Sequence, residues 1–113
     1  MPSDKERGYL KDILDNINLA EEFASDLTYN QLRDDVRTLY AVIRSLEIIS
    51  EASRRLPQDM KSRHAEIPWS AMAAAGNFYR HNYEEVTSKR VWRTLREDLP
   101  PLRKAIETEL ARG

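Results

Sequence analysis

Residues 29–56 constrain the fold more than any other part of the chain, because their apolar members recur every three or four positions and lie on several sides of a helix. A helix that is apolar on so many sides needs two neighbours, such as the core of the domain and a second subunit. We therefore expect one long helix over this segment, ended by Pro57, and a homodimer. The apolar residues are Leu32, Val36, Leu39, Tyr40, Val42, Ile43, Leu46, Ile48, Ile49, Ala52 and Leu56.

The preceding segment follows the same periodicity. Apolar residues between Leu10 and Phe23 predict a first helix over about residues 4–26. Asp26 and Thr28 mark a turn and offer a capping oxygen for the helix that follows. Nowhere in the chain do β-branched residues alternate with polar ones over the length of a strand, so we expect an all-α fold.

Prolines divide the second half of the chain. Residues 58–66 are polar and predict one or two turns of helix. Pro68 suits the first turn of another helix, which we expect to run to about Asn82. The alanines of this helix would let its backbone approach a neighbour closely.

The last part of the chain predicts two further helical segments. Thr87 or Ser88 can cap the first of them, and Pro100 and Pro101 break or kink it before the final segment. We find no internal repeat and no linker, and this length suits one domain. We therefore predict that residues 1–113 form a single antiparallel helical bundle of four to five main helices.

Charge and composition narrow the class of protein. With 18 Lys+Arg against 19 Asp+Glu, the net charge of -1 provides no bulk attraction to nucleic acid or anionic lipid, so RNA binding would need a local basic patch. The chain has no cysteine, which excludes disulfides and thiolate metal sites. No apolar run is long enough for a membrane span, and the first residues are charged throughout. We expect a cytoplasmic protein without a membrane partner.

Four short patterns follow one another in a fixed order along nearly the whole chain. They are residues 41–52, the helix start Ile67-Pro68-Trp69, the signature Asn-(three residues)-His-x-Tyr at Asn77, His81 and Tyr83, and Val91-Trp92 followed by residues 98–102. Each pattern alone is weak. Together they resemble the HepT family of HEPN-type toxins.

The resemblance implies a HEPN-like helical homodimer and a specific activity. HepT-like proteins are toxins of toxin–antitoxin pairs that cut RNA without a metal ion or cofactor, through an Arg-(four to six residues)-His motif in a cleft at the dimer interface. A minimal nucleotidyltransferase antitoxin silences the toxin by transferring AMP to the tyrosine of His-x-Tyr. Carried over to this chain, His81 is the catalytic histidine, Asn77 supports it, and Tyr83 accepts the AMP.

One position departs from the family pattern. The family arginine most often stands five positions before the histidine, where this chain has Gly76. Arg80, one helical turn after Gly76, could reach back toward the same place. Arg44, on the long helix, is a second possible source of positive charge. The sequence does not choose between a relocated and a lost arginine.

The missing arginine matters because of the chemistry. In metal-independent cleavage the 2′-hydroxyl attacks its own phosphodiester, and histidine suits the transfer of both protons because its ordinary pKa is about 6.5. An arginine donates paired hydrogen bonds to the charged phosphorus centre. Loss of such a donor typically costs about 2.7–4 kcal/mol of transition-state stabilisation, or about a hundred- to a thousandfold in rate.

Two functions therefore remain open. The first is an RNA-cleaving HepT-like toxin in which Arg80 replaces the missing arginine beside His81. The second is a non-catalytic HEPN-type dimer that binds a nucleotidyltransferase partner, a nucleotide or RNA.

Several other polar residues have simpler interpretations. We expect His64 to be solvated in its polar turn, and Asp34 and Asp35 point in different directions and make a poor metal pair. Three basic pairs are most simply solvated helix faces, although they could form the basic rim of an RNA cleft. They are Arg54 and Arg55, Lys89 and Arg90, and Arg93 and Arg96.

Overall fold

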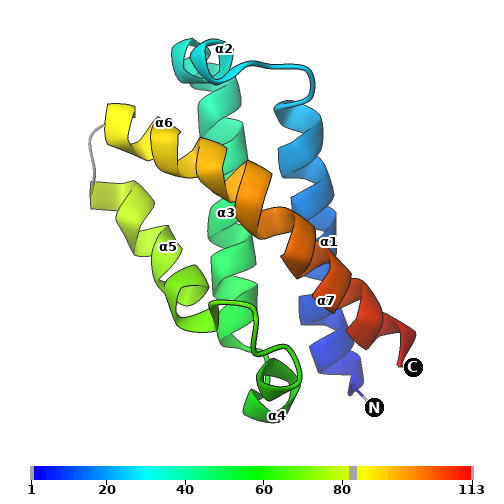
Figure 1. Cartoon of the computed structure of the whole chain (residues 1–113). Helices are drawn as coiled ribbons and strands as arrows, with labels where there is room; N and C mark the ends of the chain where they lie inside the picture. Colours follow the sequence, from blue (N-terminus) through cyan, green and yellow to red (C-terminus); the bar gives the residue numbers. More distant parts are fainter. Residues whose placement is uncertain (1, 82–83, 113) are drawn as a thin grey trace.

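The helical bundle is built around an antiparallel pair, α1 (Asp4–Phe23) and α3 (Val36–Arg54) (Figure 1). The computed structural model describes residues 2–81 and 84–112, and of residues 77–81 and 84–86 it describes the backbone alone. α1 buries Leu10, Ile13, Ile17 and Ala20, which share one face at helical spacing. Ser3 begins α1 with a capping box, in which the Ser3 hydroxyl and the Glu6 carboxylate accept from each other's backbone N–H.

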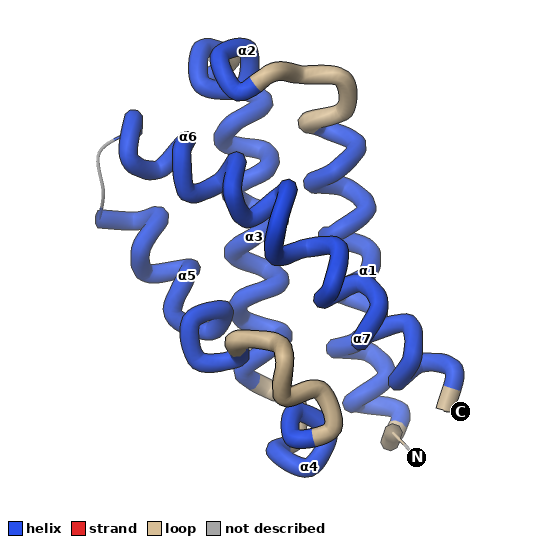
Figure 2. Tube along the Cα trace, viewed as in Figure 1, coloured by secondary structure: helices blue, strands red, loops and turns tan. Residues whose placement is uncertain are grey.

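The other elements pack around this pair. α2 (Tyr29–Asp34) and α4 (Gln58–Ser62) are short, and α5 (Trp69–His81) lies along α3. α6 (Glu84–Arg93), the π-helical turn η1 (Thr94–Asp98) and α7 (Leu99–Ala111) form one bent run that crosses in front of α3 and α1 in Figure 1. Within the described ranges every regular element is helical, as Figure 2 shows, so the predicted all-α bundle is confirmed.

The prediction of one continuous helix over residues 29–56 is wrong in one respect, because the helix is interrupted at Asp35. The backbone of Asp35 leaves the helical region (φ -97, ψ 87), and its carboxylate accepts from the backbone N–H of Thr38 at 3.1 Å and from the Thr38 hydroxyl at 2.7 Å. Asp35 therefore caps the start of α3, and this capping competes with continuation of the helix. The preceding turn contains Asp26, with φ 64, and Thr28 caps α2 as expected.

Two expectations for the C-terminal half also need correction. Thr87 and Ser88 do not cap a helix, since α6 begins at Glu84 and both residues are buried inside it. Pro100 and Pro101 do not end the helical run, because they occupy the first turn of α7, where a missing N–H is tolerated. The run changes direction at the π-helical turn immediately before them.

The connection that leads into α5 is fixed by a buried carboxylate. Glu109 of α7 is 2% exposed. It accepts two hydrogen bonds from Arg63, at 2.7 and 3.3 Å, and lies 2.6 Å from His64 Nε2. The indole N–H of Trp69 donates to the carbonyls of Lys61 and His64 at 3.1 and 3.0 Å. The side chain of His64 is only 12% exposed, so the expectation that His64 is solvated is wrong.

Candidate functional site

The predicted site residues lie on the last turns of α5 or just beyond it. Asn77, Arg80 and His81 belong to the helix, but their side chains are outside the described part of the chain. Tyr83 is outside the described residues altogether. The roles of these four residues therefore stay predictions, while the surroundings of Gly76 are described in full.

Ser50 of α3 holds α5 in place next to Gly76. Its hydroxyl donates to the carbonyl of Ala73 at 2.9 Å, and the N–H of Gly76 donates to the Ser50 hydroxyl oxygen at 3.4 Å. Both residues of α5 are small, so its backbone comes within reach of a short side chain on α3. The predicted close approach of the alanine-rich helix to a neighbour is confirmed, and that neighbour is α3.

Arg54 strengthens the same contact. Its Nε and Nη2 donate to the carbonyl of Ala73 at 3.0 and 2.6 Å, so this oxygen accepts from both Ser50 and Arg54. A charged donor makes these hydrogen bonds stronger than neutral ones. Ser50 and Arg54 are one turn apart on α3 and together form what we call the α3–α5 clamp.

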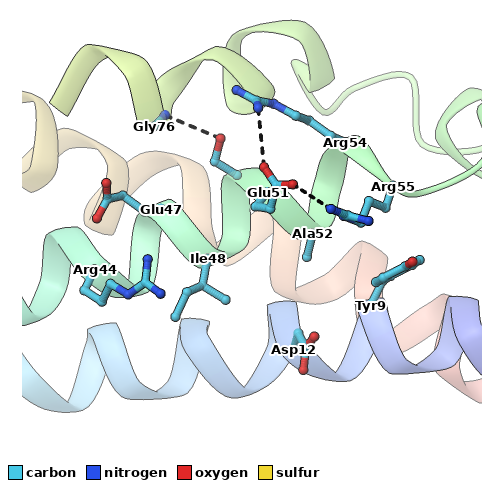
Figure 3. A pocket seen from close by; sticks show the side chains of 11 residues that line it. Tyr9, Asp12, Arg44, Glu47, Ile48, Glu51, Ala52, Arg54, Arg55 and Gly76 are labelled. Atoms are coloured by element: carbon cyan, nitrogen blue, oxygen red, sulfur yellow. Dashed lines mark hydrogen bonds and ion pairs between the residues drawn. The ribbon is translucent and has the colours of Figure 1, made fainter. Parts of the chain in front are cut away.

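A cavity of about 330 Å³ opens beside the clamp, between α1, α3 and α5 (Figure 3). Gly76 forms part of its wall, and its charged lining is balanced between three basic and three acidic side chains. The residues around it are Tyr9, Asp12, Arg44, Glu47, Ile48, Ser50, Glu51, Ala52, Arg54, Arg55 and Gly76.

The three arginines of the cavity differ in their partners. Arg55 donates to Glu51 at 3.0 Å and lies 5.9 Å from the centre of the Tyr9 ring, and Glu51 also pairs with Arg54 at 3.4 Å. The neighbouring Glu51 carboxylate raises the pKa of Arg55. Arg44 is exposed and makes no hydrogen bond or ion pair with any other residue in the described ranges. Arg44 is therefore the one arginine of the three whose guanidinium has no partner within the described ranges.

Position 76 has room for a larger residue. A Cβ atom built there would lie 3.5 Å from Ser50 Oγ and 3.8 Å from Ser50 Cβ, which are ordinary van der Waals distances. A longer side chain would begin beside Ser50, at the wall of the cavity. Glycine is therefore not required at this position by steric exclusion of a Cβ.

Sequence reasoning missed the α3–α5 clamp and the cavity. Ser50 is one of three serines on the buried part of α3, together with Ser45 and Ser53. A serine at a core position of a long apolar helix has to find a hydrogen-bond partner, so this pattern was a usable signal. Its partner on α5 could not be identified from the sequence.

No group of His, Cys, Asp or Glu within the described ranges is arranged to hold a metal ion. None of the helices described has both the length and the apolar character that crossing a membrane requires.

Comparison with known proteins identifies the family. The family model "Ribonuclease HepT-like" matches residues 13–109. The chain is 42% identical over 101 residues to "Probable ribonuclease HepT" of Thermococcus cleftensis, covering 89% of this chain and 92% of the relative. It is 36% identical over 101 residues to "Putative RNase MJ1380" of Methanocaldococcus jannaschii, covering 89% and 93%. No solved structure matches the chain.

The all-helical fold and the family match along most of the sequence define a HEPN-type helical protein. The chain belongs to the ribonuclease HepT-like family. The resemblance seen in the sequence is thereby confirmed.

Proposed function

We propose that this chain is the toxin of a toxin–antitoxin pair and a metal-independent endoribonuclease of the cytoplasm, acting as a single domain. The observation that carries the proposal is the family match over residues 13–109, which includes the Asn77, His81 and Tyr83 signature. Relatives over nearly the same length are named as ribonucleases. The substrate class we assign is therefore RNA.

In the proposed reaction His81 serves as the proton-transfer group. One imidazole takes the proton of the 2′-hydroxyl, the oxygen attacks the adjacent phosphorus, and the 5′-oxygen leaves with a proton from an acid. A histidine from each subunit would supply the base and the acid in a dimeric site. No cofactor takes part in this scheme, and Asn77 supports the histidine.

The cation of the site is proposed to come from Arg80. Arg80 follows Gly76 by one helical turn on α5, so a side chain from position 80 starts on the same side of the helix as one from position 76. Arg44 is the second candidate, because it lines the cavity whose wall includes Gly76 and has no ion-pair partner in the described ranges.

The proposed homodimer is supported by four exposed apolar side chains toward one end of the α1–α3 pair. Leu19 and Phe23 near the end of α1, and Val36 and Tyr40 at the start of α3, are all exposed. Exposed apolar side chains that gather at neighbouring helix ends mark interaction sites in soluble proteins. A second copy of the chain would cover these side chains.

The proposed antitoxin is a minimal nucleotidyltransferase that modifies Tyr83. An added AMP would place a bulky, negatively charged phosphate beside His81 and repel the RNA backbone. The second candidate function is a non-catalytic dimer that binds this partner, a nucleotide or RNA, and it is favoured by the glycine at position 76.

An RNA cleavage assay with the purified chain tests the proposal. We expect cleavage in the presence of EDTA, and loss of cleavage in His81→Ala with unchanged helicity by circular dichroism. His64→Ala is not a suitable control because His64 contacts Glu109, so the exposed Lys104→Ala is used instead. Cleavage that stops on chelation would contradict the metal-independent mechanism, and an inert wild type would favour the non-catalytic dimer.

A further inference from the structure

A basic stripe with an aromatic residue in its middle runs along α6 and η1. Lys89 is three and four residues before Trp92 and Arg93, and Arg96 is four and three residues after them, which places all four on one side of the helix. Lys89, Arg93 and Arg96 are exposed and Trp92 is half-buried. From Thr87 to Arg96 the sequence has four basic residues and no acidic one, although the whole chain is slightly acidic.

The aromatic residue of this stripe is held in a stack of rings and guanidinium groups. Arg96 lies over the Trp92 ring, 4.5 Å from its centre, and Tyr29 of α2 meets Trp92 edge-on at 6.1 Å and 67°. Arg33 lies over the Tyr29 ring, 5.9 Å from its centre. The Tyr29 hydroxyl is 3.4 Å from Ser88 Oγ, which ties α2 to α6. Flat groups of this kind are the surfaces on which unpaired bases stack.

A hollow of about 370 Å³ opens beside this stack, at the turn between α1 and α2. Trp92, Leu95 and Arg96 form one wall, and Leu27 is on the other. Its volume falls within the range of small-ligand pockets, so it has room for a single base. Two acidic residues, Glu21 and Asp26, also line the hollow, and Glu21 is already paired with Arg103.

Three other arginines of the chain are less available to an anion than those of the stripe. Arg54 and Arg55 are bound to Ala73 and Glu51. Arg90 is half-buried and lines a different cavity, next to α5. By contrast, the 4.0 Å pair between Arg93 and Glu97 is exposed on both sides and therefore weak.

The position of the stripe relates it to the candidate site. α6 begins at Glu84, three residues after His81, and Figure 1 shows the end of α5 and the start of α6 at the same corner of the molecule. At 1.5 Å per residue, the stripe lies about 8 to 18 Å along the helix from its first residue. A strand bound on the stripe can therefore extend to the end of α5.

We propose that Lys89, Trp92, Arg93 and Arg96 form a binding surface for single-stranded RNA. The three cations contact the phosphates, and one base stacks against the Trp92–Arg96 pair beside the hollow. The contacts read no base edge, so the surface accepts many sequences. That the bound strand is a substrate rests on the function proposed above, whereas binding itself does not.

Binding is measured without cleavage. The probe is a fluorescein-labelled oligouridine whose 2′-hydroxyls are methylated, titrated with the full chain at salt concentrations between about 50 and 200 mM. The test variant is Lys89→Gln/Arg93→Gln/Arg96→Gln, and its charge-matched control is Lys5→Gln/Lys11→Gln/Lys104→Gln, at exposed positions of α1 and α7. Removal of three phosphate contacts should reduce the slope of log Kd against log salt by about 2, at roughly 0.7 per contact, while the control keeps the wild-type slope.

Stacking has its own readout. RNA should quench the fluorescence of Trp92, and Trp92→Phe, which keeps an aromatic ring in the core contact, should lose the quenching while Trp69 remains. Loss of base stacking typically weakens binding about 5- to 150-fold. We expect the loss of affinity in Trp92→Phe to be near the lower value.

The outcomes separate this proposal from the ribonuclease function. RNA binding by the wild type, together with a reduced slope in the test variant, supports the surface even if the wild type never cleaves RNA. Equal slopes in the test and control variants overturn it, even if the wild type is an active nuclease. Loss of a protein partner by the test variant, with RNA affinity unchanged, overturns it in favour of a protein-binding surface.

Discussion

The buried carboxylate of Glu109 gives the sharpest stability prediction. Glu109→Gln keeps the shape of the side chain but removes the charge that pairs with Arg63 at 2.7 Å and contacts His64 at 2.6 Å. Breaking a fully buried pair costs about 3–5 kcal/mol, and losing a hydrogen bond to a charged group costs about 1.5–3 kcal/mol. Because the Arg63 side chain is 34% exposed and glutamine still accepts a hydrogen bond, we expect about 2 kcal/mol.

The loss should be visible in thermal unfolding. For a domain of this size, about 2 kcal/mol corresponds to a fall in Tm of about 8 °C at neutral pH. Glu107→Gln is the matched control, since Glu107 is on the same helix and exposed, and it should shift Tm by no more than about 2 °C. Circular dichroism at 222 nm, a wavelength that reports helix, measures both variants.

The same substitution has a predictable pH dependence. The hydrogen bond from Arg63 lowers the pKa of Glu109, and His64 adds to the lowering against the opposing effect of burial. A carboxylate with a lowered pKa in the folded state stabilises that state above its ordinary value of 4.5, and the stabilisation is lost as the pH falls through the folded-state pKa. The difference in Tm between wild type and Glu109→Gln should therefore be constant near neutrality and shrink in acid. A Glu109→Gln protein that melts like Glu107→Gln at neutral pH would refute the reasoning.

Four further predictions concern the site and the dimer. Arg80→Ala should reduce RNA cleavage about a hundred- to a thousandfold. Arg80→Lys should be little more active, because lysine lacks the paired donors of arginine. Adding Gly76→Arg to the Arg80→Ala variant should restore part of the activity. Tyr40→Glu, at a position 62% exposed, should turn a sedimenting dimer into a monomer without loss of helicity, and a wild-type monomer at micromolar concentration would contradict the dimer. After co-expression with the antitoxin, mass spectrometry should show an added adenylate on the wild type and none on Tyr83→Phe. Ser50→Ala should lower the free energy of unfolding by about 1 kcal/mol in denaturant titrations, because it removes the hydrogen bond to Ala73.

The apolar periodicity predicted the core well because helix burial repeats at a fixed spacing. Leu10, Ile13 and Ile17 of α1, for example, are all fully buried. The break at Asp35 was missed because apolar positions continue in phase on both sides of it, and the cap depends on one carboxylate and Thr38. Local polar competition of this kind does not disturb a hydrophobic pattern.

The polar contacts between distant segments could not be predicted. Glu109 lies among buried apolar residues of α7. Its partners, Arg63 and His64, precede it by 46 and 45 positions in the sequence. The α3–α5 clamp likewise joins Ser50 to a carbonyl 23 residues later. A sequence shows that a buried polar residue needs a partner, but the choice of partner is set only when the helices pack.

The source of the cation decides how the site depends on the rest of the fold. Arg80 is on α5 with His81, so the two move together whatever happens to the contact between α5 and α3. Arg44 is on α3, and its position relative to α5 depends on the α3–α5 clamp of Ser50 and Arg54. Ser50→Ala should therefore leave cleavage almost unchanged if Arg80 supplies the cation, and should reduce it well beyond the loss of stability if Arg44 does. Cleavage that is insensitive to Arg80→Ala but sensitive to Ser50→Ala would move the cation to α3, and would make the helix contact beside Gly76 part of the catalytic geometry.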